Sequence, residues 1–270
     1  EAVPVADVLD EFCHSRYGAN AERLKAIWRK VIPMSYMLDW GSNYSYLFTR
    51  ETLGRSQWNA GKELSLKWGP AVAEAPAVFA ALADADWRGE AMRRDTIDLA
   101  RTALDRLIIQ RTREFVRDYE LWRANKRAGD DLVARIDVLA ALVERMADVL
   151  ALHTDYSLWE SYLRLDAVEK VRNPDFPQVL FENASCSYCQ SHQYELARHW
   201  YAPRARAFAR RVAELVAAGD RKAELKLPSG EAERLALMKR SLESLKPTLP
   251  RTAESYVRVM RALSEEARTK

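Results

Sequence analysis

Apolar residues recur at intervals of three and four along most of the chain, which is the period of an amphipathic α-helix. The longest such stretch runs from about Gly89 to Ala128. Its stripe consists of Ile97, Ala100, Leu104, Ile108, Phe115, Tyr119 and Trp122. We expect Gly129 to end this helix and Asp130 to cap the next, over Asp131–His153. A short connection between two long helices predicts one long central helix hairpin.

The same period, interrupted by glycine and proline, predicts the other helices. They cover about residues 4–17, Asn20 to near Pro33, Trp58–Trp68, Pro70–Ala83, Asp155–Arg172, Tyr194–Leu215, Pro228–Leu245 and Thr252–Arg268. No stretch alternates between apolar and polar residues as a strand does. The pattern therefore predicts an all-α fold, an irregular antiparallel helical bundle of about eight to ten helices in a single domain, 1–270.

One stretch, Pro33–Gly54, loses the helical period and is rich in aromatic residues, serine, asparagine and glycine. A connection of this length is commonly a lid or a binding loop. Its aromatic residues, Trp40, Tyr44 and Tyr46 among them, could equally fasten a long loop to the core. Both interpretations stay open from the sequence.

The distribution of charged and apolar residues indicates which kinds of partner the chain can bind. The chain has 42 basic and 39 acidic residues, a net charge of +3, and they alternate along the predicted helices. Nucleic-acid binding requires a segregated basic patch, which this pattern lacks, so we expect no nucleic-acid partner. No apolar run approaches the ~20 residues that span a bilayer, so we expect no membrane partner. The chain begins with Glu1 inside an amphipathic stretch, which suggests a piece cut at a domain boundary.

The segment Val179–Phe208 concentrates the groups that could bind a ligand. Cys186, Cys189 and His192 follow the spacing C-x-x-C-x-x-H, which suits half of a zinc site. A second ligand pair is missing, so we expect both cysteines to behave as small buried hydrophobic residues. We therefore predict no metal and no cofactor.

The second half of this segment predicts a helix with one apolar stripe. The stripe consists of Tyr194, Ala197, Tyr201, Ala205, Phe208, Val212 and Leu215. His192 and His199 share another face, where solvent exposure is the simpler expectation. Pro203 should kink the helix, since it lacks a backbone N–H. Carboxylates are expected on exposed helical faces, and Glu182 is interpreted as a surface acid. No catalytic residue is predicted.

Three stretches resemble the C-terminal all-helical domain of the α-N-acetylglucosaminidase family, glycoside hydrolase family 89. The first is Phe12-Cys-His-Ser-Arg-Tyr-Gly18 followed by Ala26-Ile-Trp28, which is similar to the "RYG…AW" entry into that domain. The second is Arg94–Leu104, in which Asp95, Asp98, Leu99 and Arg101 match the "YDLxDLxRQxL" helix. The third is Trp200-Tyr-Ala-Pro-Arg204 with Phe208, which is similar to "YYxPRWxxF".

The resemblance implies a function. In the family, two glutamates on a preceding (β/α)₈ barrel perform retaining hydrolysis, and this chain has no β/α pattern for such a barrel. It implies a domain that buttresses the barrel and walls part of the sugar pocket. The family's tryptophan and Gly-Pro before the third motif are missing here, but Ser187-Tyr188 is similar to an Asp-Tyr pair of the family. The resemblance therefore implies Tyr188 as the substrate-binding residue.

The implied partners are the N-terminal catalytic barrel of the same polypeptide and a glycan that contains N-acetylglucosamine. The isolated chain is expected to be inactive, because it lacks the catalytic glutamates. By the resemblance alone, the compartment would be secreted, periplasmic or lysosome-like. The alternative is a non-enzymatic helical scaffold or protein-interaction domain.

Overall fold

The computed structural model describes residues 4–35, 69–169, 175–185 and 192–269, and within these ranges it is helical with no strand. Ten helices have eight residues or more in the described ranges. The helices are α1 Val5–Tyr17, α2 Ala21–Ser35, α5 Ala75–Ala83, α6 Glu90–Arg123, α7 Gly129–Ala151, α8 Leu158–Glu169, α9 Phe176–Ser185, α10 Tyr194–Leu196, α11 Ala202–Ala217, α12 Glu231–Met238, α13 Leu242–Leu245 and α14 Ala253–Glu266. The predicted all-α bundle is confirmed.

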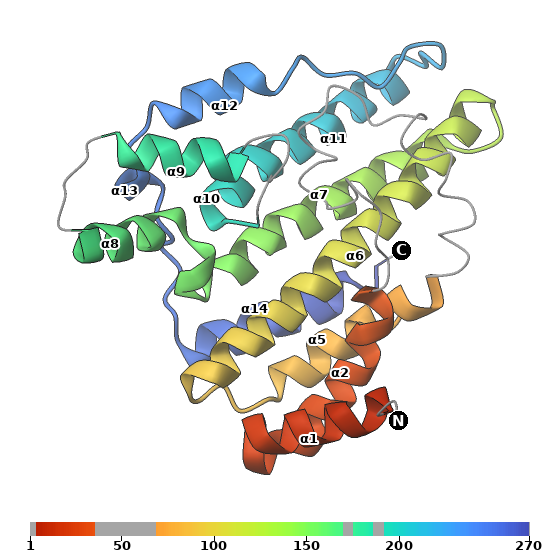
Figure 1. The fold of residues 1–270 in the computed structure, drawn as a ribbon. Helices are drawn as coiled ribbons and strands as arrows, with labels where there is room; N and C mark the ends of the chain where they lie inside the picture. The colour runs from red at the N-terminus through yellow and green to blue at the C-terminus, as the bar shows by residue number, and fades with distance from the viewer. Residues whose placement is uncertain (1–3, 36–68, 170–174, 186–191, 270) are drawn as a thin grey trace.

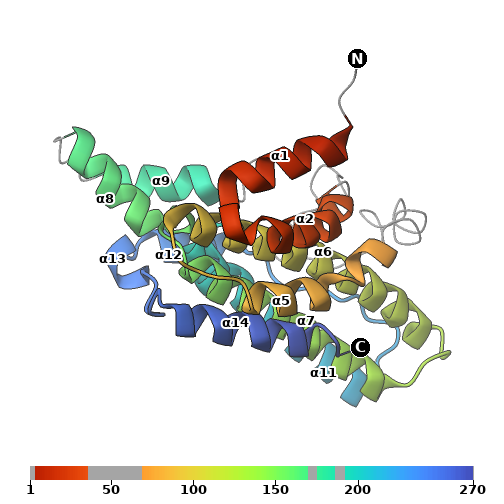
Figure 2. The same cartoon turned by 90° about the horizontal axis from the view of Figure 1, so that it is seen from below.

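The predicted hairpin of α6 and α7 forms the centre of the bundle (Figure 1). α6 has 34 residues and α7 has 23, and α11 runs along the other side of α7. α5 and α14 pack together beside α6, and α1 and α2 form a layer over its N-terminal half (Figure 2). This arrangement brings segments far apart in the sequence to one face of α6.

The core consists of the stripes that the sequence predicts on α6 and α7. All seven predicted residues of α6 are buried, from Ile97 to Trp122. On α7 the buried stripe is Leu132, Ile136, Leu139, Val143, Met146 and Leu150. Together with the stripe from Tyr194 to Leu215, they belong to one continuous apolar cluster. Burial of this area is the main favourable contribution to folding.

The end of α6 differs from the prediction. The helix stops at Arg123, and Gly129 begins α7 instead of ending α6. Asn125 takes the left-handed conformation, with φ of 59°, and the Lys126 N–H bonds back to the carbonyl of Leu121 at 2.8 Å. This is a Schellman motif, which asparagine supports because its side chain tolerates positive φ.

Three other predicted helices are divided or shifted. The helix expected over Pro70–Ala83 is interrupted near Glu74, and α5 begins again with Pro76 in its first turn. The helix expected over Pro228–Leu245 is two, α12 and α13, separated at Ser241, whose hydroxyl caps α13. A 3₁₀ turn over Thr154–Tyr156 precedes α8. α9 has no counterpart among the predicted helices.

The sequence predicts a kink at Pro203, and the irregular turn of this helix lies immediately before that residue. Residues Ala197–Tyr201 form a π-helical turn, and Pro203 then lies in the first turn of α11. Pro203 has no N–H to donate, and the π turn ends just before it with a hydrogen bond from the Ala202 N–H to the carbonyl of Ala197. The extra residue of the π turn thus accommodates the proline without breaking the apolar stripe.

Candidate functional site

The N-terminal half of α6 carries four polar residues along one face. Asp95, Asp98, Arg101 and Asp105 are three, three and four residues apart, so they lie on successive turns of the helix. We call them the α6 polar row. Each bonds to a neighbour on the row or on another segment, and these partners come from α1, from the turn before α8 and from the residues just before α10. The row therefore connects the first and second halves of the chain.

Asp95 joins α6 to α1. Its carboxylate accepts hydrogen bonds from both Nε and Nη2 of Arg16, the latter at 2.9 Å, and from the hydroxyl of Tyr17 at 2.9 Å. The Tyr17 hydroxyl in turn accepts from Trp28 Nε1 at 3.1 Å. Burial, supported by the neighbouring carboxylate, raises the pKa of Tyr17, so its hydroxyl stays a neutral donor.

Asp95→Asn should lower the free energy of unfolding by about 1 kcal/mol, because an amide keeps the shape but loses the charge-assisted pair with Arg16. Urea denaturation measures the loss. The control is Asp86→Asn, since Asp86 also pairs with an arginine, Arg88, but that arginine is 89% exposed and two residues away. Equal losses in the two variants would contradict a special role for the contact between α1 and α6.

Asp98 forms a small network with Arg101 and Tyr156. Arg101 Nη2 donates to Oδ1 of Asp98 at 2.7 Å, and the Tyr156 hydroxyl donates to the same oxygen at 2.9 Å. The guanidinium of Arg101 lies 6.0 Å from the centre of the Tyr156 ring. Burial opposes the ionisation of Asp98, but the charge and hydrogen bond of Arg101 outweigh it and lower the pKa. Asp98 is thus a carboxylate at neutral pH.

Asp105 and His192 meet at the C-terminal end of the row. Oδ1 of Asp105 lies 3.4 Å from His192 Nε2, and Oδ2 lies 3.0 Å from Arg106 Nη1. Asp105 is buried, while His192 is half-buried. This contact places the His192 ring beside the middle of α6. His192 is the residue that follows the stretch 186–191 in the chain.

Glu195 is a buried carboxylate three residues after His192 in the sequence. It accepts hydrogen bonds from the Ser157 hydroxyl at 2.6 Å and from the backbone N–H groups of Leu158 and Trp159 at 2.8 and 3.1 Å. It therefore caps the N-terminus of α8, where N–H groups lack helical partners. Burial raises the pKa of Glu195.

Several predicted site residues lie outside the described ranges. Tyr188 and both cysteines of the C-x-x-C pair fall within 186–191. The aromatic residues Trp40, Tyr44 and Tyr46 fall within 36–68. What the sequence predicts for Tyr188, for the two cysteines and for the aromatic loop therefore remains a prediction.

The two histidines are less exposed than expected. His199 is half-buried, and its Nε2 lies 3.3 Å from the carbonyl oxygen of Leu245. Burial lowers its pKa. His192 contacts Asp105, so neither ring is freely solvated. Glu182 is exposed and accepts from Gln178, as expected of a surface acid.

The expectation that carboxylates lie on exposed faces is wrong for three of them. Asp105, Asp118 and Glu195 are all buried. Their partners are arginines, a histidine, a hydroxyl or backbone N–H groups, and most of these come from distant segments. A single sequence carries no local signal for such pairs. The one partial signal is Ser157, because a serine immediately before a helical stretch marks the N-terminus of a helix, here the one that Glu195 caps.

Potential metal ligands gather at one other place in the described ranges. Asp10, His14 and Glu22 bring ligand atoms within 4.8 Å of one another on the surface of α1 and α2. The ammonium group of Lys25 already bonds to both carboxylates. Its hydrogen bond lowers the pKa of Asp10. Lys25 thus supplies the positive charge that a cation would bring.

Comparison of the chain with protein-family models, curated proteins and solved structures gives no match. The helices of the described ranges include none with the length and apolar character needed to cross a membrane. The described residues form an all-α helical bundle. Its function has to be argued from the residues that the bundle brings together.

Proposed function

We propose that the chain is the C-terminal helical domain of an exo-acting, α-N-acetylglucosaminidase-like glycoside hydrolase. In this proposal it buttresses the catalytic barrel and walls part of the sugar pocket. The observation that carries the proposal is the contact between two of the three resembling stretches. Arg16 and Tyr17 of the first stretch bond to Asp95 of the second, across 79 and 78 positions of sequence.

The α6 polar row supplies groups that suit a sugar. A pyranose presents hydroxyls at its edge, and carboxylates, guanidinium groups and phenols can bond to them. Asp98, Arg101 and Tyr156 provide these groups in one network. Aromatic faces suit the apolar C–H faces of the ring, and we assign this role to Tyr188, which stands four residues before His192 in the sequence.

Exposed apolar residues support a protein neighbour near this side of the bundle. Large exposed apolar side chains lie on α1, α8 and α9, which Figure 2 shows toward one side of the bundle. They are Val5, Val8, Phe12, Leu163, Val168 and Val179. Val5, Val8 and Phe12 are three and four residues apart and so share one face of α1, and a contiguous apolar patch marks a protein interface. The barrel, with its two catalytic carboxyls ~5 Å apart, would cover them.

The same apolar residues also favour the second candidate, a non-enzymatic scaffold that binds another protein. The coding sequence immediately upstream of Glu1 separates the two. A reading frame that encodes a barrel with two acidic strand ends favours the glycosidase domain. A stop codon followed by a start signal favours the scaffold.

The isolated chain and the upstream-extended polypeptide should differ in activity. We expect the chain alone to leave an aryl α-N-acetylglucosaminide intact, and the extended polypeptide to hydrolyse it. Release of the aryl group measures turnover. Hydrolysis by the chain alone, abolished by one Glu→Gln change within it, would overturn the assignment as an accessory domain.

In the extended enzyme, Tyr188→Ala should weaken transition-state binding by about 1–3 kcal/mol, seen as a lower kcat/KM, and leave the Tm nearly unchanged. Tyr188→Phe keeps the ring and should keep most of the activity. Steady-state kinetics and thermal unfolding of the three proteins provide the measurement. A large loss of stability with unaltered kinetics would show that Tyr188 is a core residue.

A further inference from the structure

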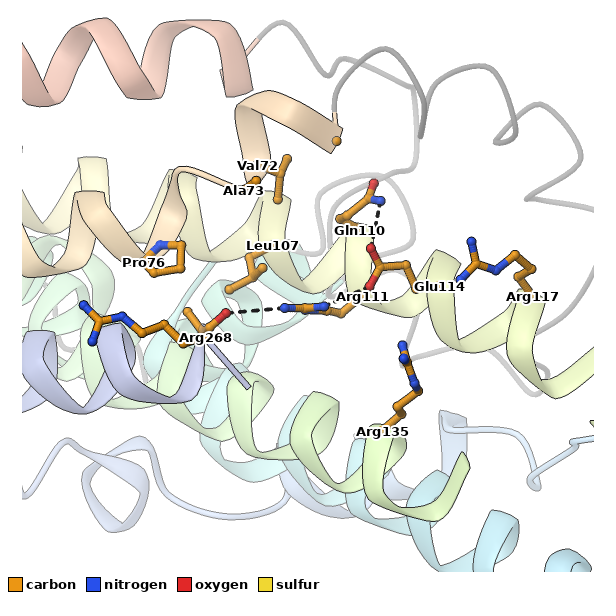
Figure 3. Close-up of a pocket in the computed structure, with 12 residues that line it drawn as sticks. Val72, Ala73, Pro76, Leu107, Gln110, Arg111, Glu114, Arg117, Arg135 and Arg268 are labelled. Carbon is orange, nitrogen blue, oxygen red and sulfur yellow. Dashed lines mark hydrogen bonds and ion pairs between the residues drawn. The ribbon is translucent and has the colours of Figure 1, made fainter. Parts of the chain in front are cut away.

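A cavity of about 600 Å³ opens between the middle of α6, the segment from Gly69 to Pro76, the start of α7 and the C-terminal end of α14 (Figure 3). Val72, Pro76 and Leu107 form its apolar wall. Its other wall is basic, with Arg111, Arg117, Arg135 and Arg268. This volume lies in the range of small-molecule sites. The cavity lies on the C-terminal half of α6, beyond the α6 polar row.

Beside the basic wall, three arginines converge on one carboxylate. Asp118 is fully buried, and its oxygens form ion pairs with Arg127 Nη1 at 2.7 Å, Arg135 Nη1 at 3.2 Å and Arg117 Nη2 at 3.3 Å. Three guanidinium groups around one carboxylate leave an excess of two positive charges. The three arginines repel one another, and a second anion would relieve that repulsion.

Two of these arginines reach the cavity. In Figure 3, Arg117 comes from α6 and Arg135 from α7, and both guanidinium groups border the open space between the helices. Arg117 is 64% exposed at its side chain, and Arg135 is 26% exposed, so both can take a further ligand from solvent.

The other charged side chains of the cavity are either paired or directed away from Arg117. Arg111 pairs with Glu114 at 3.0 Å, and it also donates to the carbonyl oxygens of Ala267 and Thr269 at the end of α14. Glu114 accepts from Gln110 as well. In Figure 3, Arg268 extends toward the Pro76 side, away from Arg117. The surplus charge is therefore concentrated at Arg117 and Arg135.

We propose that this cavity binds the phosphate group of a small phosphorylated ligand, with Arg117 and Arg135 as its ligands. A planar guanidinium group donates two parallel hydrogen bonds, which matches the geometry of phosphate oxygens. The apolar wall of Val72, Pro76 and Leu107 would hold the remainder of the ligand. This site does not depend on the glycosidase assignment.

Inorganic pyrophosphate is the probe. Isothermal titration calorimetry of the chain, at fixed ionic strength, should show saturable binding of pyrophosphate and much weaker binding of sulfate. At a free concentration about tenfold above the Kd, the Tm should rise by about 2–3 °C. Arg135→Gln and Arg117→Gln should each weaken binding about tenfold. Arg88→Gln removes an exposed charge elsewhere and should leave the Kd unchanged.

Asp118→Asn separates a binding site from a purely structural cluster. Without the competing carboxylate, pyrophosphate should bind more tightly than to the unsubstituted chain. If the arginines served only to neutralise Asp118, this variant would gain no affinity. Arg117 is mostly exposed, so Arg117→Gln should fold even if Arg135→Gln does not. Absence of saturable binding, or an unchanged Kd in Arg117→Gln, would overturn the proposal.

Discussion

Replacing Glu195 by alanine should lower the free energy of unfolding by about 2–4 kcal/mol. The side chain is fully buried, and its loss leaves one hydroxyl and two backbone N–H groups without their acceptor. Urea denaturation measures the loss. Glu182→Ala, at an exposed position on α9, should change stability by less than about 0.5 kcal/mol. Equal effects of the two changes would contradict the capping role of Glu195.

The pH dependence provides a second measurement on the same residue. Because burial raises the pKa of Glu195, the folded state holds this proton more tightly than the unfolded chain does. Its contribution to stability should fall as pH rises from the unfolded value, about 4.3, through the folded-state pKa, and then level off. Glu195→Gln cannot titrate and should lack this slope.

The comparison is therefore the difference in unfolding free energy between the unsubstituted chain and Glu195→Gln, measured from about pH 4 to about pH 8. We expect the unsubstituted chain to lose stability relative to the variant across that range. Glu195→Gln should also be less damaging than Glu195→Ala, since its amide oxygen still accepts a hydrogen bond. A difference that grows with pH would show that the hydrogen bonds of Glu195 outweigh its burial.

Gly129→Ala should lower the free energy of unfolding by about 2 kcal/mol, although alanine is ordinarily the better helix former by about 1 kcal/mol. Gly129 lies in the first turn of α7, where α11 approaches closely. An added Cβ would overlap the Cγ1 methyl of Val216 and lie 3.4 Å from Nε1 of Trp122. The branched side chain of Val216 has few alternative rotamers.

A double-mutant cycle tests this steric explanation. Val216→Ala removes the obstructing methyl, so in that background Gly129→Ala should become neutral or stabilising. Gly69→Ala is the control, because among the described residues its added Cβ would have only Gln110 Nε2 in range, at 4.0 Å. If Gly129→Ala were equally harmful in the Val216→Ala background, backbone conformation and not packing would be the cause.

The resemblance motifs illustrate what a sequence can contribute to a site. The second stretch matches at Asp95, Asp98, Leu99 and Arg101, and the spacing of the three polar residues is sufficient to place them on one face of a helix. The stretch with Arg16 and Tyr17 was selected separately. Only the packing of α1 and α2 against α6 places the two together, and only the turn before α8 adds Tyr156.

The sequence by itself determined the all-α fold, the central hairpin and the buried stripes of α6, α7 and α11. A helical period depends on residues three and four apart, so a short stretch of sequence is enough to reveal it. The period on α1 also predicted a helix correctly, yet Val5 and Val8 are 65% and 53% exposed. Periodicity indicates that a face is apolar, but it does not reveal what covers that face.

Tertiary structure decided where charge is buried and where helices end. Glu195 bonds to Ser157, which is 38 positions away in the sequence. Asp118 forms ion pairs with Arg127 and Arg135 only because α6 and α7 fold back on each other. Gly129 looked like the end of a helix, but close packing against α11 puts it at the start of one. These features depend on partners distant in sequence, and burial of their charges is tolerated only when those partners are in place.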